Sequence, residues 1–184
     1  MRRDLVERAM TGDHDAFAEL ARVTTGRLFV VARLILRDDA AAEDAAQEAL
    51  VAAWRHIRGL RDPDRFDAWL HRLLVNACHR EAGKRQRRRT MEVHVPSFDV
   101  PEPDPNLGLL DRDQLERGFR RLDMDQRAVL VLHHYAGLPL DEIAQALGVP
   151  PGTVRSRLHR ATRAMRAALE ADARGPMADG RRLA

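Results

Sequence analysis

Apolar residues recur along this chain at the spacing of α-helices. The clearest case starts at Phe66, after which apolar side chains follow at i+3, i+4, i+7, i+8 and i+11, as far as Ala77. This spacing places them all on one side of a helix. Weaker stripes of the same kind predict two earlier helices, over 14–36 and 40–57, the first of them capped by Asp13. The N-terminal half is therefore predicted to be a compact helical bundle.

The C-terminal half shows a second series of helical patterns. Helices are predicted over 109–122 and 125–135, and a short helix follows that ends at Gly148, a residue suited to the left-handed conformation past a helix C-terminus. Pro150 and Pro151 then start a new helix, because proline is accepted in the first helical turn and not in the interior. A short helix, a tight glycine turn and a second helix predict a helix-turn-helix.

The segment between the two halves has a different composition. Residues 91–110 contain four prolines and several acidic residues but few apolar ones, which predicts an extended, semi-stiff linker. The chain thus divides into a helical domain over 1–90, the linker over 91–110, a helix-turn-helix domain over 111–172 and a frayed tail over 173–184. The predicted fold class is all-α, with two small helical domains joined by an extended, acidic, Pro-rich linker.

The net charge is only +3, but the basic residues are unevenly placed. Seven basic residues and a single acid, Glu81, lie between positions 72 and 89, and five arginines with no acid lie between 153 and 166. Solvated surface helices usually mix both signs. Two basic stripes therefore indicate two contacts with a polyanion.

The second basic stripe covers one face of the last predicted helix, opposite an apolar face that includes Val154. Arginine near the start of such a helix can pair with guanine through two hydrogen bonds, and hydroxyl groups can reach phosphates or base edges. A charged helix face is also often no more than solvated surface, and here the lack of acids and the preceding glycine turn favour DNA binding. The candidate contacts are Thr153, Arg155, Ser156, His159 and Arg160.

Length and composition exclude several classes of protein. With 184 residues, 45% hydrophobic and 32% charged, the chain can form one ordinary domain or two small ones. No apolar run reaches the roughly 18–20 residues of a membrane span, and charges occupy the place of a signal peptide's apolar stretch. The single cysteine, Cys78, forms no internal disulfide, which fits a reducing compartment. We therefore expect a cytoplasmic protein without membrane insertion.

The sequence contains no good candidate for a catalytic or metal-binding site. Among the eight histidines, His71 and His79 can share a helix face, but no third ligand lies at a suitable spacing. The signatures HExxH and GxSxG and a glycine-rich phosphate loop are absent. Cys78 lies within a helical pattern and is expected to be inert and half-buried. We expect no enzymatic activity, no metal site and no cofactor.

Five segments in order resemble the sigma-70 family of bacterial transcription initiation factors, and within it the extracytoplasmic-function (ECF) group. They are GDHDAFAEL (12–20), AAEDAAQEALVAAW (41–54), FDAWLHRLLVNACHREAGKR (66–85), LERGFRRLDMDQRAVLVL (115–132) and GLPLDEIAQALGVPPGTVRSRLHRA (137–161). The resemblance implies a first domain, sigma region 2, that binds RNA polymerase and melts the minus-ten promoter element. It implies a second domain, sigma region 4, that reads the minus-thirty-five element.

The resemblance also implies roles for individual residues. Polymerase contacts are implied at Glu43, Asp44, Gln47 and Glu48. Minus-ten contacts are implied at His56, Leu60 and Asn76, with Arg72, Arg80, Lys84 and Arg85 placed to meet phosphates. In region 4, Arg157 joins the candidate contacts named above. Leu60 stands where the family often has an aromatic residue, and Pro139 stands where it often has a Ser or Thr cap.

The implied function is that of an ECF-type sigma factor, with core RNA polymerase, promoter DNA and an anti-sigma factor as partners. The alternative is a conventional helix-turn-helix regulator that binds an operator, in which the N-terminal bundle dimerises or senses a ligand. A regulator is expected to bind a palindromic duplex tightly on its own, whereas a sigma factor needs polymerase for strong binding. Whether the acidic linker enters the polymerase cleft or only stays soluble and extended is open at this point.

Overall fold

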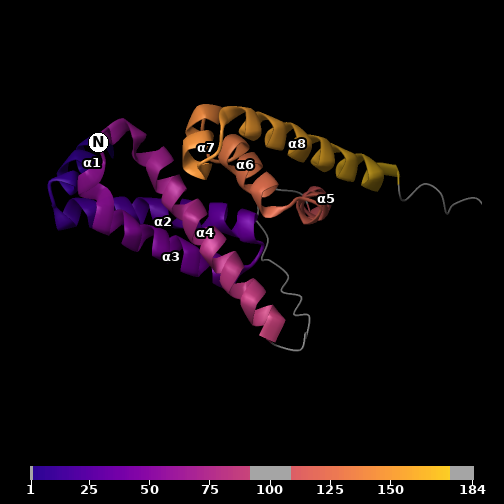
Figure 1. The fold of residues 1–184 in the computed structure, drawn as a ribbon, viewed down its shortest axis with the longest axis horizontal. Coiled ribbons are helices and arrows are strands. Elements are labelled where there is room, and N and C mark those ends of the chain that lie inside the picture. The colour runs from indigo at the N-terminus through magenta and orange to yellow at the C-terminus, as the bar shows by residue number, and fades with distance from the viewer. Residues whose placement is uncertain (1, 92–108, 175–184) are drawn as a thin grey trace, which may run out of the picture.

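The computed structural model describes residues 2–91 and 109–174, and every regular element within these ranges is a helix. An N-terminal module contains α1 (Arg2–Met10), α2 (His14–Leu36), α3 (Asp39–His56) and α4 (Phe66–Met91), with 3-10 turns at Ile57–Gly59 and Pro63–Arg65. A C-terminal module contains α5 (Leu109–Arg120), α6 (Met124–His134), α7 (Leu140–Leu147) and α8 (Pro151–Arg174) (Figure 1). The predicted all-α class is confirmed. The predicted linker over 91–110 and tail over 173–184 lie, except at their ends, outside the described residues.

Aspartate caps determine where α2 and α3 begin. The Asp13 side chain accepts a hydrogen bond from the Ala16 N–H at 3.0 Å, and Asp38 accepts one from the Ala41 N–H at 2.6 Å. Each carboxylate satisfies a backbone donor that has no partner in the first helical turn. Arg37 ends α2 in the left-handed conformation, with φ of 58°. The predicted break near residues 37–39 is therefore a tight junction between two helices.

Alanine residues let α3 pack closely between α2 and α4. The inner face of α3 presents Ala42, Ala45, Ala46, Ala49 and Ala53, each at most 3% exposed. Because methyl side chains keep the helix axes close, longer side chains from the two neighbours meet around them. These neighbours contribute Leu20, Leu28, Val31, Ile35, Leu70 and Leu74 to the same core.

The sequence patterns did not predict α1. It has nine residues, and only Val6 and Ala9 are buried, so it carries too few apolar positions to form a recognisable stripe. A helix this short has little stability of its own and depends on tertiary contacts. One such contact joins Arg3 Nη1 to Asp64 Oδ2 at 2.6 Å, which ties α1 to the loop before α4.

The helix-turn-helix forms as its turn residues predict. Gly148 ends α7 with φ of 64°, and the Val149 N–H then donates to the Ala144 carbonyl at 3.1 Å. This arrangement satisfies a carbonyl at the end of α7 and turns the chain sharply. Pro151 begins α8, as proline at a helix start should. Pro139 precedes α7 without a side-chain capping bond, and α7 forms nonetheless.

The two modules pack directly against each other. Helix α2 contacts α6, and α4 contacts α7, as Figure 1 also shows. Buried residues of both modules belong to one continuous apolar cluster, to which Leu28 and Leu74 contribute from one side and Leu132 and Ile143 from the other. The sequence patterns predicted two domains and a linker but gave no sign of this contact.

The helices carry charge along their length. The longest, α4 and α8, have 26 and 24 residues and each includes several arginines. In neither described range is there a helix that is both long and apolar enough to cross a membrane.

Cys78 is fully buried in α4, not half-buried as expected from the sequence. Burial raises the pKa of its thiol to about 12, because the thiolate would lose its hydration in the core. The side chain is therefore a protonated thiol at neutral pH, and its expected inertness has a physical cause.

Replacing Gly148 should destabilise the helix-turn-helix. The change Gly148→Ala puts a Cβ on a backbone at φ of 64°, which should lower the free energy of unfolding by about 1 kcal/mol. Gly83→Ala is the matched control: Gly83 lies in α4 with open space around it, so the change should raise stability by about 0.5–1 kcal/mol. Urea unfolding followed by circular dichroism measures both. Equal effects of the two changes would contradict the left-handed turn.

Candidate promoter and polymerase interfaces

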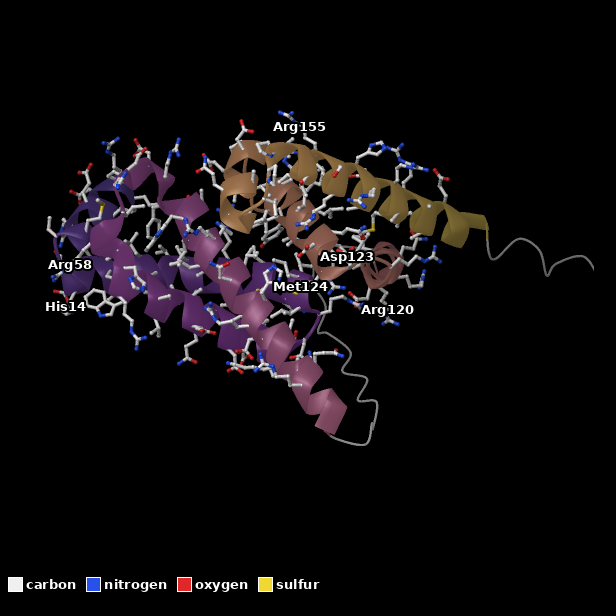
Figure 2. The ribbon with its side chains drawn as sticks, viewed as in Figure 1. His14, Arg58, Arg120, Asp123, Met124 and Arg155 are labelled. Atoms are coloured by element: carbon white, nitrogen blue, oxygen red, sulfur yellow. The ribbon has the colours of Figure 1, made fainter. Side chains whose placement is uncertain are left out.

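The first turns of α8 present a polar face to solvent. Arg155, Ser156, His159 and Arg160 are exposed, whereas Val154 on the other face is fully buried. In Figure 2, Arg155 lies at the upper edge of the molecule and points away from the C-terminal module. The Ser156 hydroxyl donates to the Thr153 carbonyl at 2.9 Å, and half-buried Thr153 lies at the margin of this face. We call Thr153, Arg155, Ser156, His159 and Arg160 the α8 face. A ligand could reach this face without any change in α8 itself.

Arg157 differs from its neighbours on α8. Its side chain is 23% exposed, and its guanidinium lies 2.8 Å from the Asp125 carboxylate in the first turn of α6. The pair joins α8 to α6 and helps to hold α8 in place. Of the six residues predicted to contact minus-thirty-five DNA, Arg157 is the one whose charge already has an acidic partner.

The residues expected to recognise the minus-ten element lie on α4, at the end of α3 and in the loop between these helices. Arg72 and Asn76 are one turn apart on α4, and both are exposed. His56 is exposed at the end of α3, so its ring can also reach a ligand. Leu60 is 8% exposed and belongs to the core, so its side chain offers only a small edge to a base.

Three basic residues of α4 form ion pairs with acids. Arg80 lies 2.8 Å from Glu48, Lys84 lies 2.6 Å from Glu81, and Arg85 lies 2.7 Å from Asp38. The hydrogen bond that Lys84 donates to Glu81 raises the pKa of Lys84 above its usual value. The pairs with Glu48 and Asp38 join α4 to α3 and its N-cap, whereas the Lys84–Glu81 pair lies within α4. All three lower the net positive charge of the stripe. The Arg80–Glu48 pair also links one predicted phosphate contact to one predicted polymerase contact.

A groove of about 480 Å³ lies between α2 and α3, next to the residues predicted to bind polymerase. The groove is lined mostly by apolar residues. The full set is Thr25, Gly26, Phe29, Glu43, Ala46, Gln47, Leu50 and Val51. Val51 is 42% exposed, which is unusual for a large aliphatic side chain. Asp44 is exposed beside the groove on α3. Glu43 and Gln47 were predicted, but the apolar part was not, because it forms only when α2 and α3 are placed side by side in space.

Helix α1 supports the loop that precedes α4, a feature that the sequence did not reveal. Arg2 forms two hydrogen bonds to the Asp67 carboxylate, and Arg3 binds Asp64. At the same end of the module (Figure 2), Gly12 has φ of 98° and lets the Arg58 guanidinium approach its backbone. The loop is therefore held from the α1 side as well as by the core.

The histidines form no metal site among the described residues. No group of three or more His, Cys, Asp or Glu residues within these ranges could hold a metal ion. His71 is buried with Nδ1 2.7 Å from the Asp67 carbonyl oxygen, and burial lowers its pKa below the ordinary value. His71 is therefore neutral at pH 7.

Comparison with known proteins identifies both modules. Residues 8–88 match the family Sigma-70 region 2, and residues 112–165 match Sigma-70, region 4. The chain is 35% identical to the ECF RNA polymerase sigma factor SigM of Mycobacterium tuberculosis, over 86% of this chain and 79% of that protein. It is 31% identical to the RNA polymerase sigma-H factor of Pseudomonas aeruginosa, over 91% of this chain and 93% of that protein.

Two solved structures share the fold over most of the chain. One is the sigma factor RpoE in complex with the anti-sigma factor NepR from Bartonella quintana, with a TM-score of 0.72 and 25% identity over 85% of this chain and 98% of that chain. The other is CnrH in complex with the cytosolic domain of CnrY, with a TM-score of 0.68 and 28% identity over 93% of this chain and 98% of that chain.

The chain belongs to the sigma-70 family, and its relatives place it in the ECF group. Its function is that of an ECF sigma factor, which joins core RNA polymerase and directs it to promoters. Sigma factors are initiation factors and not enzymes. The matches support this function and not the operator-binding alternative, because the N-terminal module matches sigma region 2.

Arg155 and Arg157 have different surroundings on α8, so replacing them should affect different properties of the chain. Arg155→Ala should reduce discrimination for the minus-thirty-five element by about 1–3 kcal/mol, because its exposed guanidinium is free to read a base. Arg157→Ala should instead lower the stability of the C-terminal module by up to about 1 kcal/mol, because it breaks the pair with Asp125. Transcription from promoters with matched and altered elements, together with thermal melting, separates the two. A uniform loss at every promoter for Arg155→Ala would make it a phosphate contact.

Proposed function

We propose that the α2–α3 groove is the surface by which this sigma factor binds core RNA polymerase. The observation that carries the proposal is an open apolar groove bordered by Glu43 and Gln47, two of the residues that the family resemblance marks as polymerase contacts. An amphipathic helix can place apolar side chains in such a groove. The carboxylates of Glu43 and Asp44 can then pair with basic residues on the partner helix. Glu48, which also pairs with Arg80, belongs to the same proposed polymerase surface.

The same proposal assigns DNA recognition to the two remaining surfaces. The exposed pair Arg72 and Asn76, with His56, contacts the minus-ten element, where an amide can read the edge of a flipped base. Leu60, which is mostly buried in the core, offers only a small apolar edge to that base. Arg80, Lys84 and Arg85 contact phosphates once their acidic partners are displaced or shared. The α8 face contacts the minus-thirty-five element, with Arg157 holding α8 in position.

In this proposal, the chain has two functional domains, the region 2 domain over 1–90 and the region 4 domain over 111–172. Catalysis stays with the polymerase, and the chain acts beside it in the cytoplasm. An anti-sigma partner is supported by the fold shared with RpoE, which was solved with the anti-sigma factor NepR. Capture of the native chain from its own cells, followed by mass spectrometry, would identify such a partner.

One matched pair of substitutions tests the polymerase surface. Val51→Asp places a charge in the groove and should weaken binding to core polymerase at least tenfold, because the carboxylate must lose water when the partner helix docks. Val23→Asp is the control: Val23 is 50% exposed on α2 but does not line the groove, so its binding should stay within twofold of wild type. Fluorescence anisotropy with purified core polymerase measures both. Equal affinities for Val51→Asp and Val23→Asp would contradict docking in the groove.

A further inference from the structure

The segment that joins α3 to α4 has few side chains in the core. It covers residues 57–65, contains both 3-10 turns and includes Leu60, one of the proposed minus-ten contacts. Ile57 and Leu60 are buried and Pro63 is half-buried, whereas its other residues are exposed. Hydrogen bonds within the segment, such as that from the Leu60 N–H to the Ile57 carbonyl at 3.0 Å, shape its turns. They do not fix where the turns lie on the module, so contacts from other elements must do so.

Helix α1 contacts both 3-10 turns of this segment. Arg3 donates from Nη1 to the Asp64 carboxylate at 2.6 Å, in the second turn. Arg2 donates to both carboxylate oxygens of Asp67, in the first turn of α4, and its guanidinium lies 5.9 Å from the centre of the Phe66 ring. A guanidinium that donates two parallel bonds fixes direction as well as distance. Helix α1 therefore binds the segment and the start of α4 at the same time.

The turn between α1 and α2 gives the segment a second point of support. Gly12 in this turn has φ of 98°, and the Arg58 guanidinium lies so close to its backbone that a Cβ would come within 2.4 Å of Nη2. Asp13, the next residue, caps α2 and lies 2.7 Å from Arg8 of α1. The turn is thus fixed to both helices, and Arg58 of the first 3-10 turn packs against it (Figure 2).

The polar contacts of α1 orient the segment more than they stabilise the fold. The side chains that form the pairs of Arg2 and Arg3 are between 41% and 62% exposed. Exposed ion pairs contribute little to the free energy of unfolding. The apolar contact comes instead from Val6 and Ala9, which belong to the same buried cluster as Leu60. Breaking the two pairs should therefore leave the module folded and change the position of the 3-10 turns.

We propose that α1 positions the segment between α3 and α4 for recognition of the minus-ten element, with Arg2 and Arg3 as positioning residues. One pair ends on the segment and the other on α4, so together they set the distance between Leu60 and Asn76. A site that reads a base needs its parts held to within roughly 0.5 Å. In this role neither arginine touches DNA. The inference rests on the proposed minus-ten surface.

A charge exchange in the full-length chain tests this role. Discrimination is measured with core polymerase as the ratio of run-off transcription from a promoter with its natural minus-ten element to that with an altered one. Arg2→Glu with Arg3→Glu should lower this ratio at least fivefold and leave the affinity for core polymerase within twofold of wild type. Adding Asp64→Arg and Asp67→Arg restores both pairs with reversed charge and should return the ratio to within twofold. Arg22→Glu is the matched control, because it breaks an exposed pair within α2 alone.

Wild-type discrimination in the Arg2→Glu, Arg3→Glu chain overturns the positioning role. A loss that the exchanged pairs do not restore also overturns it, because the arginines would then act on DNA directly. If the doubly changed chain loses its helical circular dichroism, Arg3→Ala decides, since it removes only exposed contacts and must still lower the ratio at least twofold.

Asn76→Ala, measured in parallel, separates this inference from the proposed function. Loss of discrimination in Asn76→Ala, with wild-type discrimination in the Arg2→Glu, Arg3→Glu chain, rejects the positioning role alone. Wild-type discrimination in Asn76→Ala rejects the proposed minus-ten surface itself.

Discussion

The alanine face of α3 is the constraint on which the N-terminal module depends. Because Ala42, Ala45, Ala46, Ala49 and Ala53 have no bulk, α2 and α4 both lie close to α3. The close approach of α2 leaves a shallow apolar groove on the outer side, and the close approach of α4 lets its basic residues reach the acids of α3. The packing of α2 and α4 on α3 thus determines both the proposed polymerase surface and the proposed minus-ten surface. A large side chain on this face would disturb both at once.

The sequence was sufficient wherever a feature depends on neighbouring residues. Asp13 and the Gly148 turn were predicted because a capping side chain and a left-handed glycine act within a few residues. The apolar and polar faces of α8 were predicted for the same reason, since helical spacing alone separates Val154 from Arg155.

The sequence was insufficient wherever partners come from distant parts of the chain. Helix α1 was missed because ion pairs to residues 64 and 67, and not an apolar stripe, hold it in place. The partner of Arg157 and the apolar half of the groove each required two helices to be placed in space. The contact between the modules was missed for the same reason: the Arg127–Ile35 bond joins residues 92 positions apart.

Polar contacts position the helices both within the C-terminal module and between the two modules. Within the C-terminal module, α8 is fixed by its buried face and by the Arg157–Asp125 pair, so its exposed polar groups have a defined position. Between the modules, a shared apolar cluster is accompanied by hydrogen bonds from Arg27 to the Ala136 carbonyl and from Arg127 to the Ile35 carbonyl.

Run-off transcription tests the sigma function most directly. Purified core polymerase would be incubated with fragments of the host genome, with and without this chain, and with a second sigma factor on its own promoter as the control. The account predicts discrete transcripts that require the chain, and their start sites would define its promoters. Absence of chain-dependent transcripts, while the control sigma factor initiates normally and the chain fails to bind core polymerase, would contradict the account.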